Sequence, residues 1–279
     1  MTALAVVGHV EWVDFLVAPR LPAPGEILHA DSAHEAPAGG GAMAAYAMAS
    51  LTGGCAFYCA LGEDPRAGRT AALLTEAGID VRGAVHRGRE QRRVITFLTS
   101  GDGERTITVL GPRLVPHGDD ALDWDALRRV DGVFLTAGDA GAARAARGAR
   151  VLAATPRARE AIIQAGIAVD VLVGSRDDLG EAMDDELLAA ARPRYVVQTE
   201  GAEGGAWRAA DGTAGRWDAV APACAPVDAY GCGDAFAAAL TAGLAAGRSI
   251  DAACALGARV GARLLCERAP AVGDLSPLW

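Results

Sequence analysis

Short runs of apolar residues alternate with longer segments of mixed polarity along most of the chain. Such runs are typical of strands buried in a parallel sheet, and the longer segments are typical of helices that cover it. This alternation predicts an α/β fold with a parallel central sheet and helices on both faces. The predicted strands are residues 4–8, 55–60, 132–135, 151–154, 169–174 and 195–199. The predicted helices are residues 42–51, 66–77, 121–129, 157–165 and 250–265, a short helix near residue 142, and one from about residue 234 to residue 246.

Two runs rich in β-branched residues, 92–99 and 104–109, differ from the other predicted strands. The residues between them, 100–103, read Ser-Gly-Asp-Gly, which predicts a hairpin. A two-stranded hairpin is not stable alone. We therefore expect it to form a small sheet with the runs 11–17 and 26–34.

With 279 residues the chain has room for one large α/β domain or two smaller ones, and we expect one domain, residues 1–279. Hydrophobic residues make up 51% of the chain, which is enough for a substantial core. The net charge of -9 argues against nucleic acid as a main partner, because phosphate binding needs clustered positive charge. No window approaches the ~20 apolar residues of a membrane span, and the N-terminus lacks a signal-peptide layout. We expect a cytoplasmic protein that binds a small molecule and no membrane.

Two residue counts exclude several kinds of site. All 26 basic residues are Arg, so a Walker A loop and a catalytic lysine are excluded. Nucleotide phosphates must then be held by Arg, by backbone amides or by a metal ion. The six Cys and five His residues show no spacing typical of a metal site. Cys55 and Cys59 lie four residues apart on a predicted buried strand, and we expect them to be core thiols.

A glycine-flanked loop precedes the helix that ends at residue 246. The amides of Gly231, Cys232 and Gly233 can converge on one point, and the helix dipole adds to them, so the loop favours an anion. Asp234, in the first turn, is then placed to take a proton from a hydroxyl that attacks a phosphoryl group. The alternative is an Asp that only caps or charges a helix start. Cys232 is expected to be a reactive thiol in this position, the alternative being an inert residue in a small slot.

Polar or glycine-rich segments follow two further predicted strands, at residues 174–178 and 199–204. Ligands of parallel sheets bind beyond the carboxyl ends of the strands. These segments and the loop at Gly231 are therefore expected at one site.

Residues 228–234, DAYGCGD, resemble the DTxGAGD signature of the ribokinase-like (PfkB) carbohydrate kinases, with Ala for Thr and Cys for Ala. Both Asp and both Gly positions match. The resemblance runs through nearly the whole chain. It implies a three-layer, Rossmann-like fold with a small β lid, contributed by residues 11–36 and 91–113, over the substrate cleft. It also implies that Asp234 is the catalytic base.

The first strand of the predicted lid carries the candidate residues for the acceptor. In the resembling family this strand holds a sugar-binding Asp and leads to a PxPGE turn, which Asp14 and residues 22–26 resemble. Asp14 is thus expected to project into the cleft. Glu11 is a second substrate-binding candidate; three residues away in a strand, it would face the opposite side.

Two family elements are altered in this chain. Gly40 and Gly41 resemble the substrate-contacting glycines of a GGxxxN element, but Ala44 stands at the Asn position. Ser175 and Asp178 stand at the Asn and Glu positions of the NxxE element. The resemblance implies that Asp178 still helps to hold Mg²⁺, through a water molecule.

The nucleotide-binding candidates also come from the resemblance. Thr199, Gly201 and Gly204 match a TxGxxG turn that would lie against the ATP phosphates and ribose. Asp228 belongs to the nucleotide-binding signature, and Gly257 lies in a helix that resembles the wall of the adenine pocket.

The resemblance implies an ATP-dependent, Mg²⁺-dependent kinase that phosphorylates a primary hydroxyl of a sugar or sugar-like molecule. It leaves open a monovalent cation and a homodimer formed through the lid. One rival is a nucleoside kinase of the same fold. Aromatic residues that line the lid would favour it, and Trp12, Phe15 and Tyr46 keep this alternative open. Another is a sensor that binds without turnover, suggested by the altered elements but opposed by the intact Asp234. A dinucleotide oxidoreductase is more distant, because no Gly-rich turn follows the first strand.

Overall fold

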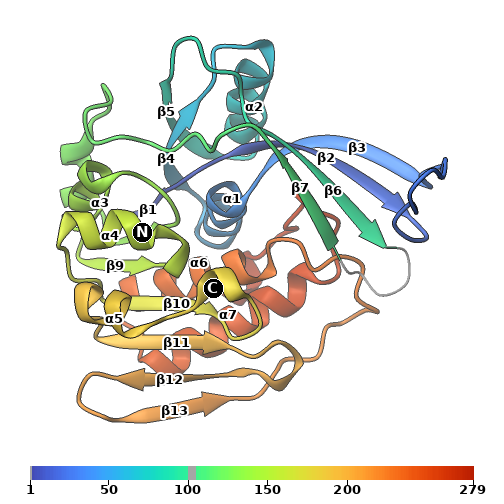
Figure 1. The fold of residues 1–279 in the computed structure, drawn as a ribbon. Helices are drawn as coiled ribbons and strands as arrows, with labels where there is room; N and C mark the ends of the chain where they lie inside the picture. The colour runs from blue at the N-terminus through green and yellow to red at the C-terminus, as the bar shows by residue number, and fades with distance from the viewer. Residues whose placement is uncertain (1, 100–104) are drawn as a thin grey trace.

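The chain folds around a central sheet with helices on both faces, and a smaller sheet projects from this body (Figure 1). The computed structural model describes residues 2–99 and 105–279. The predicted turn at residues 100–103 therefore lies outside the described residues. The α/β class and the flanking helices are as predicted.

The central sheet has nine strands in the described part of the chain, in the order β13-β12-β11-β10-β9-β8-β1-β4-β5. The strands from β11 to β5 run parallel, whereas β12 and β13 add an antiparallel edge. Strands β5, β12 and β13 are not among the predicted ones, because their residues are partly exposed and form no continuous apolar run. The strands are β1 (Leu4–Val7), β4 (Cys55–Leu61), β5 (Ile79–Val85), β8 (Gly132–Leu135), β9 (Val151–Ala154), β10 (Val171–Ser175), β11 (Tyr195–Thr199), β12 (Gly205–Ala209) and β13 (Ala214–Trp217).

Helices cover each face of this sheet because successive strand side chains point to opposite faces. Leu4 and Val6 of β1 pack in the core beneath the first layer, and Ala5 and Val7 pack in the core beneath the second. No helix among the described residues is both long and apolar enough to cross a bilayer. The first layer is α1 (Gly40–Thr52), α2 (Pro65–Glu76), α6 (Cys232–Ala245) and α7 (Ile250–Leu264); the second is α3 (Ala140–Ala146), α4 (Arg159–Ala165) and α5 (Asp185–Ala191).

Short 3₁₀ segments complete the connections. The predicted helix at residues 121–129 is one of them, η1, and its N-cap Asp123 accepts a hydrogen bond from Ala126 N–H. Leu127 is the only buried residue of η1. Packing of an apolar face supplies most of the stability of a helix, so this segment does not form a full α-helix. The 3₁₀ segments are η1 (Trp124–Arg129), η2 (Pro156–Ala158), η3 (Leu179–Glu181), η4 (Gly201–Glu203) and η5 (Ser276–Leu278).

The smaller sheet has the order β3-β2-β6-β7. Most of the expected run 26–34 is not a strand, and β3 begins at Ser32 and ends at Ala38, beyond the predicted bound at residue 36. Strand β2 pairs antiparallel with β3 and parallel with β6, and β6 pairs antiparallel with β7. One face of the sheet, with Val13, Phe15 and Val94, is buried against the main body. Its strands are β2 (Glu11–Ala18), β3 (Ser32–Ala38), β6 (Arg93–Thr99) and β7 (Arg105–Leu110).

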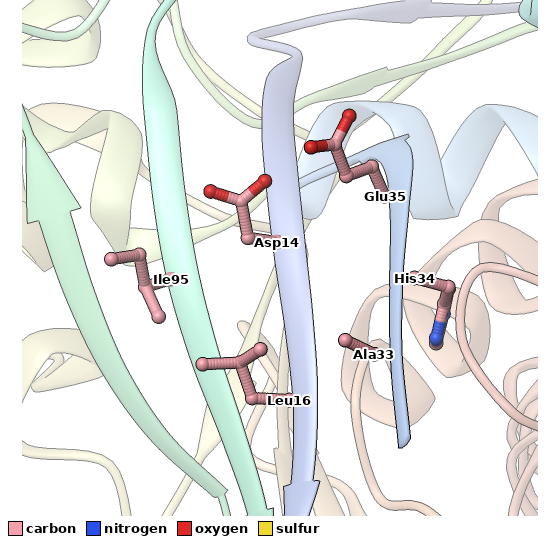
Figure 2. Close-up of a pocket in the computed structure, with 6 residues that line it drawn as sticks. All are labelled: Asp14, Leu16, Ala33, His34, Glu35 and Ile95. Carbon is pink, nitrogen blue, oxygen red and sulfur yellow. The ribbon is translucent and has the colours of Figure 1, made fainter. Parts of the chain in front are cut away.

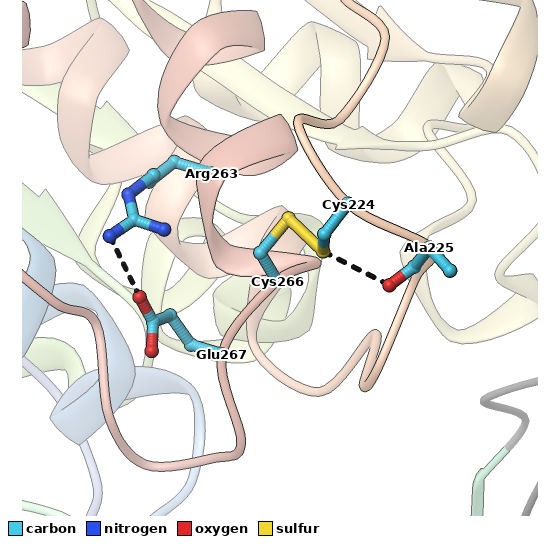
Figure 3. The surroundings of a disulfide bond; sticks show 5 residues. All are labelled: Cys224, Ala225, Arg263, Cys266 and Glu267. Atoms are coloured by element: carbon cyan, nitrogen blue, oxygen red, sulfur yellow. Dashed lines mark hydrogen bonds and ion pairs between the residues drawn. A yellow bond between two sulfur atoms is a disulfide. The ribbon is translucent and has the colours of Figure 1, made fainter.

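A disulfide between Cys224 and Cys266 joins the chain that leads into α6 to the end of α7 (Figure 3). The two cysteines are 42 residues apart, and no spacing rule in the sequence predicts their pairing. Cys55, Cys59 and Cys254 are buried free thiols, which confirms the expectation of core thiols for the first two.

Candidate active site

Helix α6 begins in a loop that only glycine can form at one position. Gly231, the N-cap residue, has a φ of 75°, and a Cβ atom added to it would lie 2.7 Å from Cε of Met43. Gly233 is exposed, and an added Cβ atom would meet nothing within 4 Å. The loop thus packs tightly on the Gly231 side and opens to solvent on the Gly233 side.

Asp234 lies where the N-termini of two helices meet. It is in the first turn of α6, and a Cβ atom added to Gly40, the first residue of α1, would lie 2.7 Å from its Oδ1 atom. The positive ends of both helix dipoles therefore face the same small volume. Gly41 is equally confined, since an added Cβ atom would lie 2.6 Å from the carbonyl oxygen of His9. Side chains are excluded at both predicted glycine positions.

The environment of Asp234 changes its acidity. Burial raises its pKa to about 7, the negative charge of Glu181 adds to this, and Arg105 and Arg157 oppose it. A carboxyl group with a pKa near 7 is about half ionised at neutral pH, and its ionised form is basic enough to accept a proton from an attacking hydroxyl. The surroundings of Asp234 thus raise its affinity for a proton.

The smaller sheet is connected to this loop at two points. The Tyr230 hydroxyl accepts a hydrogen bond of 3.0 Å from Gly39 N–H, and the Tyr230 ring lies edge-on to Phe15 of β2, with ring centroids 5.2 Å apart. Nη1 of Arg105, on β7, donates to the carbonyl oxygen of Ala229 at 3.3 Å. The small sheet therefore reaches across the start of α6.

Asp228 shapes the loop from within. It is buried, its Oδ1 atom accepts the Tyr230 N–H at 2.8 Å, and its Oδ2 atom accepts the Ala269 N–H at 3.1 Å. Both oxygens are thus engaged by backbone donors. These bonds show that Asp228 fixes the loop, and its contact with a nucleotide stays a prediction.

Cys232 does not have the surroundings of a reactive thiol. Burial raises its pKa to about 12, and the negative charges of Asp228 and Asp234 act in the same direction, against Arg105. The thiol therefore stays protonated at neutral pH. The expected reactivity is wrong, because burial and neighbouring carboxylates outweigh the helix dipole.

Asp14 and Glu11 lie on opposite faces of β2, as expected from alternation, but the faces are reversed. Asp14 forms an ion pair of 2.7 Å with Arg93 and lines a surface pocket with Leu16 and Ile95 (Figure 2). This face is the opposite one from that of Phe15, which contacts Tyr230. The expected position of Asp14 in the cleft is therefore wrong.

Glu11 occupies the face that was expected for Asp14. It is buried, and its Oε1 atom lies 3.1 Å from Nε of Arg92. A Cβ atom added to Gly39, next to the start of α1, would lie 3.2 Å from its Oε2 atom. Burial raises the pKa of Glu11, and Arg92 and Arg113 oppose this. Its charge also contributes to the raised pKa of Asp234, so the two carboxylates belong to one site.

Two polar side chains that were not predicted as site residues, His9 and Thr136, lie near the start of α1. His9 is buried, its Nδ1 atom has no hydrogen-bond partner among the described residues, and burial lowers its pKa to about 3, so it is neutral. The buried Oγ1 atom of Thr136 likewise has no partner within the described chain. Both residues follow parallel strands, β1 and β8, which is the only signal the sequence offered.

The predicted nucleotide turn lies at the end of β11. Thr199 is its last residue, and Gly201 and Gly204 have φ values of 56° and 87°. A Cβ atom added to Gly204 would lie 2.1 Å from the carbonyl oxygen of Trp217. The turn is thereby packed against the segment that follows β13, and glycine is required at Gly204 by both conformation and space.

A pocket adjoins this turn. It lies between the segment after β13 and α7, and its lining includes Trp217, Asp218 and Ala258. Gly257 does not line it, because its own position faces the ring of Phe236, 2.8 Å from an added Cβ atom. The expected contact of Gly257 is therefore replaced by helix packing, whereas its neighbour Ala258 faces the pocket.

Two carboxylates near Asp234 share one arginine. Arg157 pairs with Asp178 and, at 3.2 Å, with Glu181. Partial burial disfavours the charge of Asp178, but the Gly180 N–H and Arg157 together hold its pKa below its usual range. Glu181 also accepts the Ser175 N–H at 2.7 Å. Glu181, rather than Asp178, acts electrostatically on Asp234.

The donor set around Arg157 bears on the Mg²⁺ expectation. Carboxylate oxygens are the ligands that Mg²⁺ prefers, and this ion is commonly held through water. Asp178 and Glu181 supply such oxygens at the carboxyl end of β10, so the residues fit. Both are bonded to Arg157, which makes a water-mediated contact the simpler arrangement.

Comparisons with known proteins agree with this fold. Residues 1–273 match the family described as "pfkB family carbohydrate kinase". The structure of ribokinase from Arabidopsis thaliana complexed with ribose and ATP has a TM-score of 0.74 at 20% identity, covering 100% of this chain and 99% of that one. A putative ribokinase from Agrobacterium tumefaciens has a TM-score of 0.81 at 20% identity, covering 98% and 94%.

An adenosine kinase from Sinorhizobium meliloti is also similar, with a TM-score of 0.79 at 20% identity and coverage of 99% and 98%. Curated protein sequences give no match. The match over residues 1–273 shows that the chain belongs to the pfkB family of carbohydrate kinases.

Proposed function

We propose that the protein transfers the γ-phosphoryl group of ATP to a primary hydroxyl of a sugar or sugar-like small molecule. One observation carries this proposal: Asp234, with a pKa of about 7, lies at the meeting point of the N-termini of α1 and α6. A base for the acceptor hydroxyl and amides for the transferred group are thus adjacent.

The chemistry follows from this arrangement. Asp234 accepts the proton of the acceptor hydroxyl as the hydroxyl oxygen attacks the γ-phosphorus of ATP. The bond from the γ-phosphorus to the β–γ bridging oxygen breaks and ADP leaves, while the amides of the loop from Gly231 to Gly233 stabilise the charge on the transferred group. Arg105, which reaches the loop from β7, adds positive charge there. Bound Mg²⁺ neutralises phosphate charge in such reactions, and Asp178 and Glu181 would hold it.

The acceptor side of the site is lined by Glu11, His9 and Thr136. Glu11 accepts hydrogen bonds from hydroxyl groups as an ionised carboxylate. The unpartnered Nδ1 atom of His9 and the unpartnered hydroxyl of Thr136 offer further polar contacts. These side chains take the place of the Asn that is missing at Ala44. The small sheet would close over this side as a lid.

The nucleotide side extends from Gly233 toward β11. Thr199 and the turn at Gly201 and Gly204 face the phosphates and ribose in this proposal. The pocket lined by Trp217 and Ala258 would take the base, because one aromatic and several small apolar side chains suit a planar ring.

A coupled ADP-release assay tests this function. The protein is incubated with Mg-ATP and, separately, pentoses, hexoses, ketoses and nucleosides. We expect ADP release that depends on a sugar or sugar-like acceptor and yields a phosphorylated product. ADP release only with nucleosides would contradict the sugar acceptor and indicate a nucleoside kinase. Tight nucleotide binding with no turnover on any acceptor would contradict the kinase and indicate a sensor.

A further inference from the structure

His86, His117 and Asp120 form a compact cluster in loops that follow two different strands. His86 follows β5, and His117 and Asp120 lie between β7 and η1. Their potential ligand atoms all lie within 4.8 Å of one another. Nε2 of His86 is 3.1 Å from Oδ1 of Asp120, and the two imidazole centroids are 4.9 Å apart with their planes tilted by 38°.

Backbone hydrogen bonds hold the cluster in place. Oδ2 of Asp120 accepts the His117 N–H at 2.7 Å, and the Asp120 N–H donates to the carbonyl oxygen of His117 at 3.0 Å. The His86 N–H donates to the carbonyl oxygen of Leu61 at 2.9 Å, which fixes His86 at the end of the central sheet. A carboxylate that is itself hydrogen-bonded, as Asp120 is, is typical of the surroundings of metal ions.

We propose that His86, His117 and Asp120 bind a Zn²⁺ ion. Two imidazole nitrogens and one carboxylate oxygen suit this borderline-soft cation, whereas Mg²⁺ prefers oxygen ligands alone. Ligands about 2.1 Å from one tetrahedral ion lie about 3.4 Å apart, close to the separation of His86 and Asp120. The ligand atoms lie within 4.8 Å of one another, so the exposed His117 side chain would rotate to bring its nitrogen to this separation.

The ion would strengthen the link between two parts of the chain that the hydrogen bond between His86 and Asp120 already joins. His86 belongs to the edge of the central sheet, and His117 and Asp120 lie on the connection by which the chain returns from the small sheet. Binding here therefore stabilises that connection against local opening, by preferential binding to the folded state. Because His117 is exposed, the side of the cluster that it forms is open to solvent, and a water molecule would complete the coordination of the ion.

Zinc binding to purified, untagged protein tests the proposal. The protein is stripped with a chelator and dialysed, and ZnCl₂ is titrated against a chromophoric competitor with Zn²⁺ content checked by elemental analysis. We expect one Zn²⁺ per chain and a higher melting temperature, neither of which MgCl₂ reproduces. His117→Ala and Asp120→Asn should each weaken binding at least tenfold.

His29→Ala is the matched control, because His29 is exposed and lies outside the cluster. It should bind as tightly as the wild type. His86→Ala/His117→Ala should take up no stoichiometric Zn²⁺ while keeping the circular dichroism spectrum of the metal-free wild type. Equal uptake by this double variant, or no uptake by the wild type, would overturn the proposal.

Discussion

The Oδ1 atom of Asp234 lies 2.7 Å from the point where Gly40 would carry a Cβ atom. The first residue of α1 and the first turn of α6 are thus so close that only glycine fits beside the carboxylate. Asp234 is thereby held between two helix N-termini. This contact explains why a glycine is needed at a position whose backbone conformation does not itself require one.

Gly40→Ala is expected to lower kcat by about 10²-fold, because the added methyl group displaces the Asp234 carboxylate by part of an ångström or more. Steady-state kinetics on the best acceptor measures this. Gly68→Ala is the matched control, since Gly68 lies in α2 and an added Cβ atom there meets nothing within 4 Å. Equal rates for both variants would show that the contact with Gly40 does not position the base.

The raised pKa of Asp234 predicts a stability effect of Asp234→Asn. A folded pKa of about 7 lies above the unfolded value of about 3.9, so ionisation in the folded state costs stability. Relative to the unfolded chain, the folded state is favoured by this group as long as both are protonated, below about pH 4. That advantage falls as the pH rises from about 4 to 7, and it is lost above pH 7. Asp234→Asn should therefore gain about 3 kcal/mol in unfolding free energy, relative to wild type, between pH 5 and pH 8. Urea denaturation at both pH values measures the gain, and a constant difference would contradict the raised pKa.

Glu11 rather than Asp14 is expected to determine acceptor use. Glu11→Gln keeps the shape of the side chain but removes the charge that faces the site, and should lower kcat/KM for the acceptor by roughly 10-fold to 10²-fold. Asp14→Asn changes the other face of β2 and should leave kcat/KM within about twofold. KM for ATP should change little in both. The reverse ranking would restore Asp14 to the acceptor site.

The disulfide should contribute to stability. Cys224→Ser opens a crosslink between residues 42 apart, and the unfolding free energy should fall by about 2–4 kcal/mol. Chemical denaturation of the variant and of reduced wild-type protein should give the same loss. Titration of unreduced, denatured wild-type protein should find the four thiols of Cys55, Cys59, Cys232 and Cys254. Six titratable thiols would contradict the crosslink.

The sequence predicted most of the fold because buried parallel strands have continuous apolar runs, as in β8, which is buried throughout and whose bounds match the prediction. It also predicted the glycine loop before α6, since that loop depends on local backbone chemistry. It could not assign the faces of β2. Glu11 pairs with Arg92, and Asp14 pairs with the next residue, Arg93. Both faces of β2 therefore carry an acidic residue with an arginine partner, and the alternation of side chains does not show which face points inward.

Other parts of the site depend on contacts between distant segments. His9 and Thr136 are ordinary residues at strand ends, and only the sheet order places β1 next to β8. His86 and His117 are likewise brought together by loops after different strands. No local spacing in the sequence carries that information.

The turnover of Asp234→Asn on the best acceptor, measured at pH 8 with saturating Mg-ATP, tests the central claim most directly. Asn keeps the shape of the side chain and removes the base, so nucleotide binding should persist while kcat falls by about 10²- to 10⁴-fold. Equilibrium nucleotide binding measured on the same sample separates loss of the base from loss of the fold. A variant that binds nucleotide and retains more than about a tenth of the wild-type kcat would contradict the assignment of Asp234 as the catalytic base.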